Sequence, residues 1–258
     1  MLLPLLAALL LPPSPTRAAC VRQQPGTLWN YTGTIGATRV RLTLVFRGDS
    51  VQGIYARGDD LQDRALRGTL TAGHLLRLEE RTGTGNSAPT GRFDADFPER
   101  DPGPTYGDSP LTCDVIAGSY QPVDRNGQPT GASAAVYLTT EGSTSGSLAH
   151  RYGAIGVRDD AVVHRGAEAF WRGVQRNDRK TVAAQLRYPL TVLVKGRPRR
   201  FRSAAEFVAA YDAVMTPAFR ATILNAIPRH MFVRDQGVML GSGAVWFGRT
   251  GQVIALSP

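Results

Sequence analysis

The sequence has few of the residues that most often mark a catalytic or metal site. Its 258 residues include two cysteines and four histidines, and all but two of its 30 basic residues are arginines. The histidines are scattered and the cysteines are far apart, so neither set has the spacing of metal ligands. The chain also lacks a glycine-rich phosphate loop and a nucleophile elbow. We therefore expect no cofactor and no metal, and we favour a binding protein over an enzyme.

A long hydrophobic run is also missing. The apolar segment 2–11 is interrupted by Pro4 and is followed by the proline-rich segment 12–15 and by Thr16-Arg17-Ala18. Ten residues are too few to span a bilayer, whereas small residues at this distance are typical of a signal-peptidase site. The sequence thus predicts a signal peptide over residues 1–18, no transmembrane segment, and export to the periplasm or the outside of a bacterial cell.

Cysteine usage fits an exported protein but leaves three alternatives. Cys20 lies just beyond the expected cleavage site, and Cys113 is the only other cysteine. In an oxidising compartment the two can form a disulfide that ties the N-terminal tail to the following domain. Lipidation of Cys20 is a second possibility, although Arg17 stands where bacterial lipoprotein signals usually carry an aliphatic residue. Two free thiols are the third.

The charge is strongly basic, with a formal net charge of +9. A general preference for arginine explains this without a specific nucleic-acid partner. The one dense cluster lies in segment 195–202, where Lys195 is followed by Arg197, Arg199, Arg200 and Arg202. This cluster is either an anionic contact, with an envelope polymer or lipid headgroups as the partner, or a solvated hairpin tip.

The N-terminal half alternates apolar and polar residues in short segments that are separated by turn residues. Such segments are 40–46, 51–55, 66–70, 75–80, 90–97, 115–120 and 134–138, and a further one begins at Tyr31. About eight strands at this spacing predict an antiparallel meander that closes into a barrel, within a domain spanning residues 19–150. Three strands repeat a glycine two residues before an aromatic residue, at Gly53/Tyr55, Gly91/Phe93 and Gly118/Tyr120.

These segments resemble small exported β-barrels of the lipocalin and avidin type. They are also similar to bacterial secreted proteins that share the order Gly53-Ile-Tyr55, Leu66-Arg-Gly68, Leu76-Arg-Leu-Glu79 and Gly91-Arg-Phe93. Avidins stack biotin between several tryptophans, whereas this half contains only Trp29. Biotin is therefore not expected as a ligand.

The C-terminal half changes to helical periodicity. Residues 142–147 form the best linker candidate, and a second domain is expected over residues 158–258. Helices are predicted over 161–176, 179–186 and 204–215, with another starting at Pro217. A hairpin is expected around Gly196, and strands are expected over 230–233, 237–247 and 252–256. This order predicts an α+β cone in which a curved sheet wraps around helices.

The same half resembles exported members of the nuclear transport factor 2-like (SnoaL-like) superfamily. The resemblance rests on Phe170-Trp171 with Val174-Gln175, segment 187–190, Glu206-Phe207 with Tyr211-Asp212, and segment 237–247. It implies a cone whose open end can hold a small molecule. Some members are isomerases or dehydratases that use a carboxylate base or an Asp–His pair.

The candidate site residues follow from that resemblance and from residue chemistry. Asp212, His164 and His230 are weak catalytic candidates, and we expect Asp212 to be structural. Tyr188, Tyr211 and Trp246 are candidate ligand contacts. The chain is thus expected to be an exported two-module binding or envelope-interaction protein, with a small apolar molecule or an anionic envelope component as its partner. The alternative is an isomerase- or dehydratase-like enzyme with its site in the cone.

The mature protein is expected to begin at or near Ala19 and to contain a Cys20–Cys113 disulfide, because bridges persist in an oxidising compartment. Intact mass spectrometry before and after reduction measures both features. Two thiols that can be alkylated without reduction, or a diacylglycerol on Cys20, would contradict the disulfide.

Overall fold

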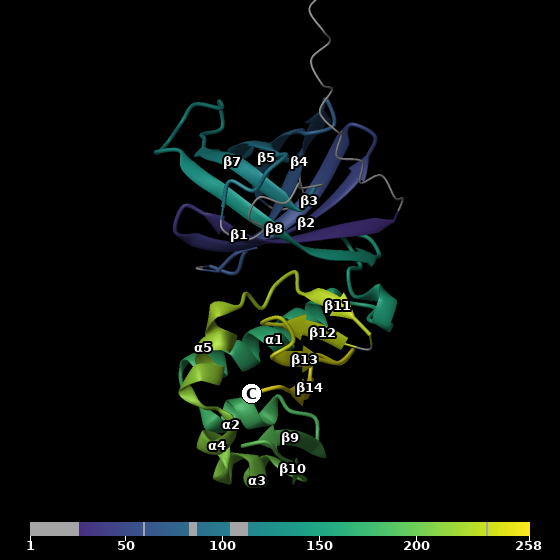
Figure 1. Ribbon diagram of the computed structural model, residues 1–258, viewed down its shortest axis with the longest axis vertical. Coiled ribbons are helices and arrows are strands. Elements are labelled where there is room, and N and C mark those ends of the chain that lie inside the picture. The colour runs from purple at the N-terminus through teal and green to yellow at the C-terminus, as the bar shows by residue number, and fades with distance from the viewer. Residues whose placement is uncertain (1–25, 59, 83–86, 104–112, 236) are drawn as a thin grey trace, which may run out of the picture.

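The computed structural model describes residues 26–58, 60–82, 87–103, 113–235 and 237–258. The expected signal peptide and Cys20 lie outside these ranges, so the cleavage site and the disulfide stay predictions. Within the described ranges, no helix is both long enough and apolar enough to cross a membrane. Figure 1 shows the β-barrel at one end and a region of helices and short strands at the other.

The N-terminal region is a closed antiparallel barrel of eight strands, as the alternating segments predict. Each strand pairs with the next along the chain, and the last pairs with the first. The strands are β1 (Thr27–Ile35), β2 (Thr38–Arg47), β3 (Ser50–Arg57), β4 (Asp63–Thr71), β5 (Leu75–Thr82), β6 (Pro89–Asp96), β7 (Val115–Pro122) and β8 (Ala134–Ser145). Closure leaves no free strand edge in the barrel.

Side chains fill the interior of the barrel because successive residues of a strand point to opposite faces. On β2, for example, Val40, Leu42 and Leu44 are buried in this core. The repeated glycine–aromatic pairs contribute to the same core. The Phe93 ring lies 5.7 Å from that of Tyr55 and 4.9 Å from that of Tyr120. A Cβ at Gly91 would come within 2.4 Å of the Tyr120 ring, so this position requires glycine.

A buried carboxylate interrupts this apolar core. Glu80 is 4% exposed and accepts hydrogen bonds from the hydroxyls of Tyr55, Tyr120 and Thr90. The Arg57 guanidinium, 3.3 Å from Glu80 Oε2, supplies the opposite charge. Burial next to this carboxylate raises the pKa of Tyr55 above its usual value. With its oxygens hydrogen-bonded and its charge paired, Glu80 links β3, β5, β6 and β7 inside the barrel.

The C-terminal region follows β8 directly. Because β8 runs to Ser145, most of the expected linker 142–147 is the end of a barrel strand. The helices are η1 (Gly153–Ile155), α1 (Asp160–Gln175), α2 (Arg179–Ala184), α3 (Ala204–Ala209), α4 (Tyr211–Val214) and α5 (Pro217–Asn225). The side chains of Asp159, Asp178, Ser203 and Thr216 cap the first turns of α1, α2, α3 and α5, which explains where these helices begin.

The strands of this region form two sheets. A hairpin consists of β9 (Leu190–Val194) and β10 (Arg197–Phe201), and a four-stranded meander consists of β11 (Phe232–Arg234), β12 (Gly237–Leu240), β13 (Val245–Phe247) and β14 (Val253–Leu256). The expected strand 237–247 is thus two strands, separated by a turn in which Gly241 and Gly243 have positive φ. The structure does not confirm the single curved sheet of a cone. A large apolar core, including Phe170, Phe207 and Phe247, holds helices and strands together.

Candidate functional site

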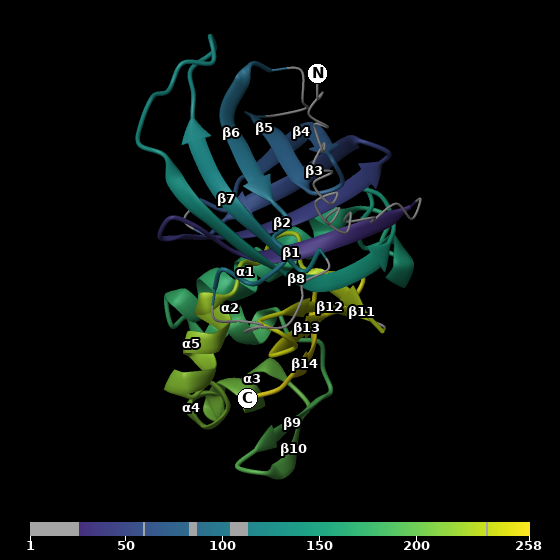
Figure 2. The same ribbon diagram turned by 45° about the horizontal axis from the view of Figure 1, so that its top comes forward.

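The candidate site lies where the barrel meets the C-terminal region. We call this contact the junction. It is formed by Arg39, Arg41 and Asp63 of the barrel and by Asn225 and His230 of the C-terminal region. Figure 2, a second view, also places the outer face of β1, β2 and β8 next to the C-terminal region.

Two arginines of β2 point out of the barrel into the junction. The Arg39 guanidinium donates hydrogen bonds to the carbonyls of Leu224 and Asn225 at the end of α5, where a cation is favoured by the helix dipole. Arg41 is 5% exposed and pairs with both carboxylate oxygens of Glu141 on β8. Its Nε donates to the backbone carbonyl of His230 at 3.3 Å. The sheet of the barrel thereby holds the backbone of the C-terminal region.

The His230 side chain contacts the side chain of a barrel residue across the junction. Its ring is completely buried, and Nε2 lies 2.9 Å from Oδ1 of Asp63, the first residue of β4. Its backbone has a positive φ of 48°, which residues other than glycine seldom adopt. An apolar contact between Ala56, Leu61 and Ile227 lies at the same boundary.

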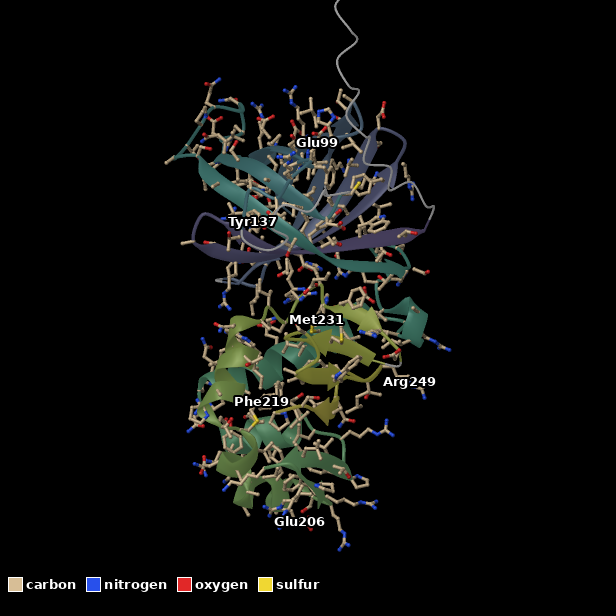
Figure 3. The ribbon with its side chains drawn as sticks, in the orientation of Figure 1. Glu99, Tyr137, Glu206, Phe219, Met231 and Arg249 are labelled. Carbon is tan, nitrogen blue, oxygen red and sulfur yellow. The ribbon has the colours of Figure 1, made fainter. Side chains whose placement is uncertain are left out.

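A second histidine lies behind the first. The rings of His164, on α1, and His230 meet edge to face with their centroids 5.7 Å apart. The Tyr152 hydroxyl lies 2.9 Å from His164 Nε2 and accepts a hydrogen bond from the backbone N–H of Met231 at 3.1 Å. Figure 3 labels Met231 at the end of the C-terminal region that faces the barrel. Arg151 Nη2 can only donate, so its 3.3 Å contact with His164 Nε2 makes that nitrogen an acceptor, to which the Tyr152 hydroxyl also donates.

Both imidazoles are neutral at physiological pH. Burial and the positive charge of Arg151 together lower the pKa of His230 to about 4, although Asp63 acts in the opposite direction. Burial and the same arginine also lower the pKa of His164. Burial raises the pKa of Asp63, but its contact with His230 and the nearby cations outweigh this and hold it below the usual range. At neutral pH the Asp63–His230 contact therefore joins an ionised carboxylate to a neutral imidazole.

Arg151 is a buried cation next to His164. Its side chain is 4% exposed and has one hydrogen-bonding contact, from Nη2 to His164 Nε2 at 3.3 Å. Within the described residues, Nε and Nη1 have no hydrogen-bond partner. The nearby Asp160 carboxylate instead accepts the backbone N–H groups of Arg151 and Tyr152. A buried cation without a carboxylate partner keeps the adjacent histidines neutral.

A cleft of about 570 Å³ lies at the junction, and residues from both regions line it. The barrel contributes Thr32, Gly33, Thr34, Arg39, Arg41, Thr139 and Glu141, and the C-terminal region contributes Thr222, Asn225, Ala226, Ile227, Gly241 and Ser242. Most of these side chains are polar, and five of them carry hydroxyl groups. A hydroxyl can donate one hydrogen bond and accept two, so this lining suits a polar ligand.

The other sequence-predicted residues lie elsewhere. Asp212 is 72% exposed and pairs with Arg179 on the surface, a contact worth about 0–1 kcal/mol. Burial raises the pKa of Tyr188 to about 12, and its hydroxyl donates to the Ala183 carbonyl at 3.0 Å. Tyr211 is buried in the C-terminal core, and Trp246 lies on β13. None of these four lines the cleft.

Metal binding has no support within the described residues, where no three His, Cys, Asp or Glu side chains converge suitably for an ion. Cys113 is buried at the barrel, and its proposed partner Cys20 lies outside the described ranges. Of the sequence-predicted site residues, the structure brings His164 and His230 together.

Sequence reasoning missed most of the junction. Arg41 occupies an outward position of an alternating strand, where an arginine is normally solvated, and Glu141 directly precedes the expected linker. Asp63 stands in a polar turn segment, and Tyr152 follows the same expected linker. The available signal was the pairing of β2 with β1 and of β1 with β8, which places Arg41 and Glu141 on one face once the barrel is known to close.

The free energy of unfolding is expected to fall as the pH decreases from about 6.5 to 4. An unfolded histidine titrates near 6.5, whereas folded His230 titrates near 4, so the unfolded state binds more protons within this window. Stability from this group is complete above pH 6.5 and is lost as the pH falls through 4, amounting to about 3 kcal/mol. Denaturant unfolding at a series of pH values measures the slope.

The matched variants are His230→Asn, which keeps a residue that tolerates positive φ, and His150→Asn, which removes an exposed imidazole. His230→Asn is expected to flatten the pH dependence by about one proton, and His150→Asn to keep the wild-type slope. An equal slope in wild type and His230→Asn would show that His230 is not buried in its neutral form.

Comparison with known proteins adds no relative. No family model matches the chain, and neither a curated protein nor a solved structure matches it significantly. Conclusions about function therefore rest on the residues and geometry of this chain.

Proposed function

We propose that the protein is an exported binding protein that holds a small polar molecule in the junction cleft. The observation that carries this proposal is the cleft itself, about 570 Å³ in volume and lined by hydroxyl, amide and guanidinium groups from both regions. Binding pockets often form where two structural units meet. Its hydroxyl, amide and guanidinium groups can form hydrogen bonds with a hydroxylated ligand.

The charges of the cleft narrow the ligand class further. Arg41 is neutralised by Glu141, whereas Arg39 is exposed and contacts uncharged carbonyl groups. A guanidinium in this setting can donate hydrogen bonds to a carboxylate or another anionic group of a ligand. Threonines 32, 34 and 139 line the barrel side and can hydrogen-bond to hydroxyls. A hydroxylated carboxylic acid, such as a sugar acid, fits this combination.

An enzyme remains the second candidate because Tyr152, His164, His230 and Asp63 form a buried polar network. A general base must reach its substrate and titrate near the working pH. Both histidines are almost fully buried, and their pKa values are lowered well below neutrality. These features favour a structural role for the network in holding the two regions together, and binding remains the better-supported function.

We also propose that the protein is exported, that it contains the Cys20–Cys113 disulfide, and that each region is related to a known family. Export is supported by the apolar N-terminal segment, and the disulfide by the two cysteines. A relationship of the C-terminal region to the nuclear transport factor 2-like superfamily is supported by its order of helices, hairpin, helices and closing strands. A relationship of the barrel to the lipocalin and avidin type is supported by its eight-stranded meander.

Filling the cleft is expected to abolish binding. Thr222, an exposed residue of α5, lines the cleft, so Thr222→Trp places an indole in it, and the neighbouring exposed Ala221→Trp serves as the control. Saturation-transfer NMR with galacturonate and galactose as probes measures binding. We expect galacturonate to bind wild type and Ala221→Trp and to bind Thr222→Trp at least about tenfold more weakly.

Three results would count against the proposal. Equal binding to Thr222→Trp and to the control would place the ligand outside the cleft. Equal binding of galactose and galacturonate would remove the role given to Arg39. If neither probe bound the wild-type protein and no small molecule co-purified with it in native mass spectrometry, the binding function itself would be rejected.

A further inference from the structure

The β9–β10 hairpin forms the end of the molecule farthest from the barrel (Figures 1 and 2). Five residue pairs join its strands, from Arg197/Val194 to Phe201/Leu190. The two residues between the strands, Lys195 and Gly196, both have positive φ, at 51° and 76°. Two such residues make the tight turn that best matches the twist of a hairpin. The tip is therefore a defined structure at one end of the molecule.

The hairpin has a high density of positive charge. Lys195, Arg197, Arg199, Arg200 and Arg202 are all exposed. None of the five forms an ion pair within the part of the chain that the structure describes. The acidic residue nearest in sequence is Glu206, which Figure 3 labels at the same end of the molecule, and its carboxylate accepts the Arg202 backbone N–H at 2.9 Å. The side chains of the hairpin thus present a cationic surface.

An exposed apolar side chain lies among these basic residues. Leu193 is 60% exposed, the most of any large hydrophobic residue in the described ranges, whereas its neighbour Val192 is 1% exposed. Directly across the hairpin from Leu193 is the exposed Pro198. Alternation along β9 therefore turns Val192 toward the core and Leu193 outward, on the same face as Arg200.

Protection of a strand edge explains only part of this arrangement. β10 has no strand on its outer side, and natural proteins place charges and proline at such edges to prevent pairing with other chains. That requirement accounts for Pro198 and for one or two arginines. It does not account for Leu193, because an exposed leucine next to a free edge promotes association.

A soluble polyanion and a lipid surface would contact different side chains of the hairpin. A polyanion interacts with the cations alone and leaves Leu193 in water. The surface of an anionic bilayer offers phosphates to the arginines and an apolar layer just beneath them for a leucine. Position favours the same partner, because a protruding tip can reach a flat surface without hindrance from the barrel.

We propose that the β9–β10 hairpin docks the protein on an anionic lipid bilayer, with Arg200 and its exposed basic neighbours on phosphate groups and Leu193, on the same face as Arg200, in the interface. The hairpin lies at the opposite end of the C-terminal region from the junction, so the docked protein keeps the cleft open to solvent. This inference does not depend on which ligand the cleft binds.

Vesicle co-sedimentation of the full mature chain tests the proposal. The probes are vesicles of phosphatidylcholine alone and vesicles of phosphatidylcholine with phosphatidylglycerol. We expect binding only to the anionic vesicles, with affinity that falls as salt is added. The double variant Arg200→Glu/Arg202→Glu is expected to bind at least about thirtyfold more weakly, because each cation near an anionic surface contributes appreciably.

Two further variants separate the alternatives. Leu193→Ser leaves the charge unchanged and is expected to weaken vesicle binding about fivefold to tenfold through lost apolar burial. Arg47→Glu/Arg67→Glu makes the same change of charge on exposed barrel strands and is expected to keep wild-type binding. Circular dichroism confirms that each variant is folded.

The proposal is overturned if wild type does not bind anionic vesicles, or if reversal of the hairpin charges has no more effect than reversal at the barrel. It is also overturned if Leu193→Ser binds vesicles as well as wild type does, because the hairpin would then contact a polyanion by charge alone.

Discussion

Burial of His230 in its neutral form is the constraint on which the arrangement of the two regions depends. Its backbone carbonyl accepts a hydrogen bond from Arg41, its ring contacts Asp63 and His164, and the next backbone N–H binds the Tyr152 hydroxyl. A protonated imidazole there would add a charge beside Arg151 in a site shielded from water. Protonation of this ring therefore weakens the packing of the barrel on the C-terminal region.

The cleft is a consequence of that packing. Neither region contains it alone, because Thr32 and Thr139 of the barrel face Thr222 and Ser242 of the C-terminal region across it. A ligand that contacts both sides would stabilise the junction by binding the assembled form and not the separated one. The buried histidines thus position the binding surfaces rather than act on the ligand. The cationic hairpin lies at the far end of the C-terminal region, where it leaves the cleft free.

The sequence predicted local structure better than it predicted contacts between distant segments. Alternation and turn residues predicted the eight barrel strands, and the helices predicted to begin at residues 179 and 204 do begin there. Segment 237–247 was predicted as one strand, whereas the turn at Gly241 and Gly243 divides it into two. The junction could not be predicted, since burial of Arg41 depends on a surface that packs on it from nearly 190 residues away in the chain.

A double-mutant cycle on Asp63 and His230 tests most directly whether the junction forms in solution. The free energy of unfolding would be measured at pH 7 for wild type, Asp63→Asn, His230→Asn and the double variant. Residues in contact have interaction energies of about 0.5–3 kcal/mol, whereas distant sites add to within about 0.5 kcal/mol. Packing of the barrel on the C-terminal region through these side chains predicts a coupling of at least about 1 kcal/mol. Additive effects of the two substitutions would contradict it.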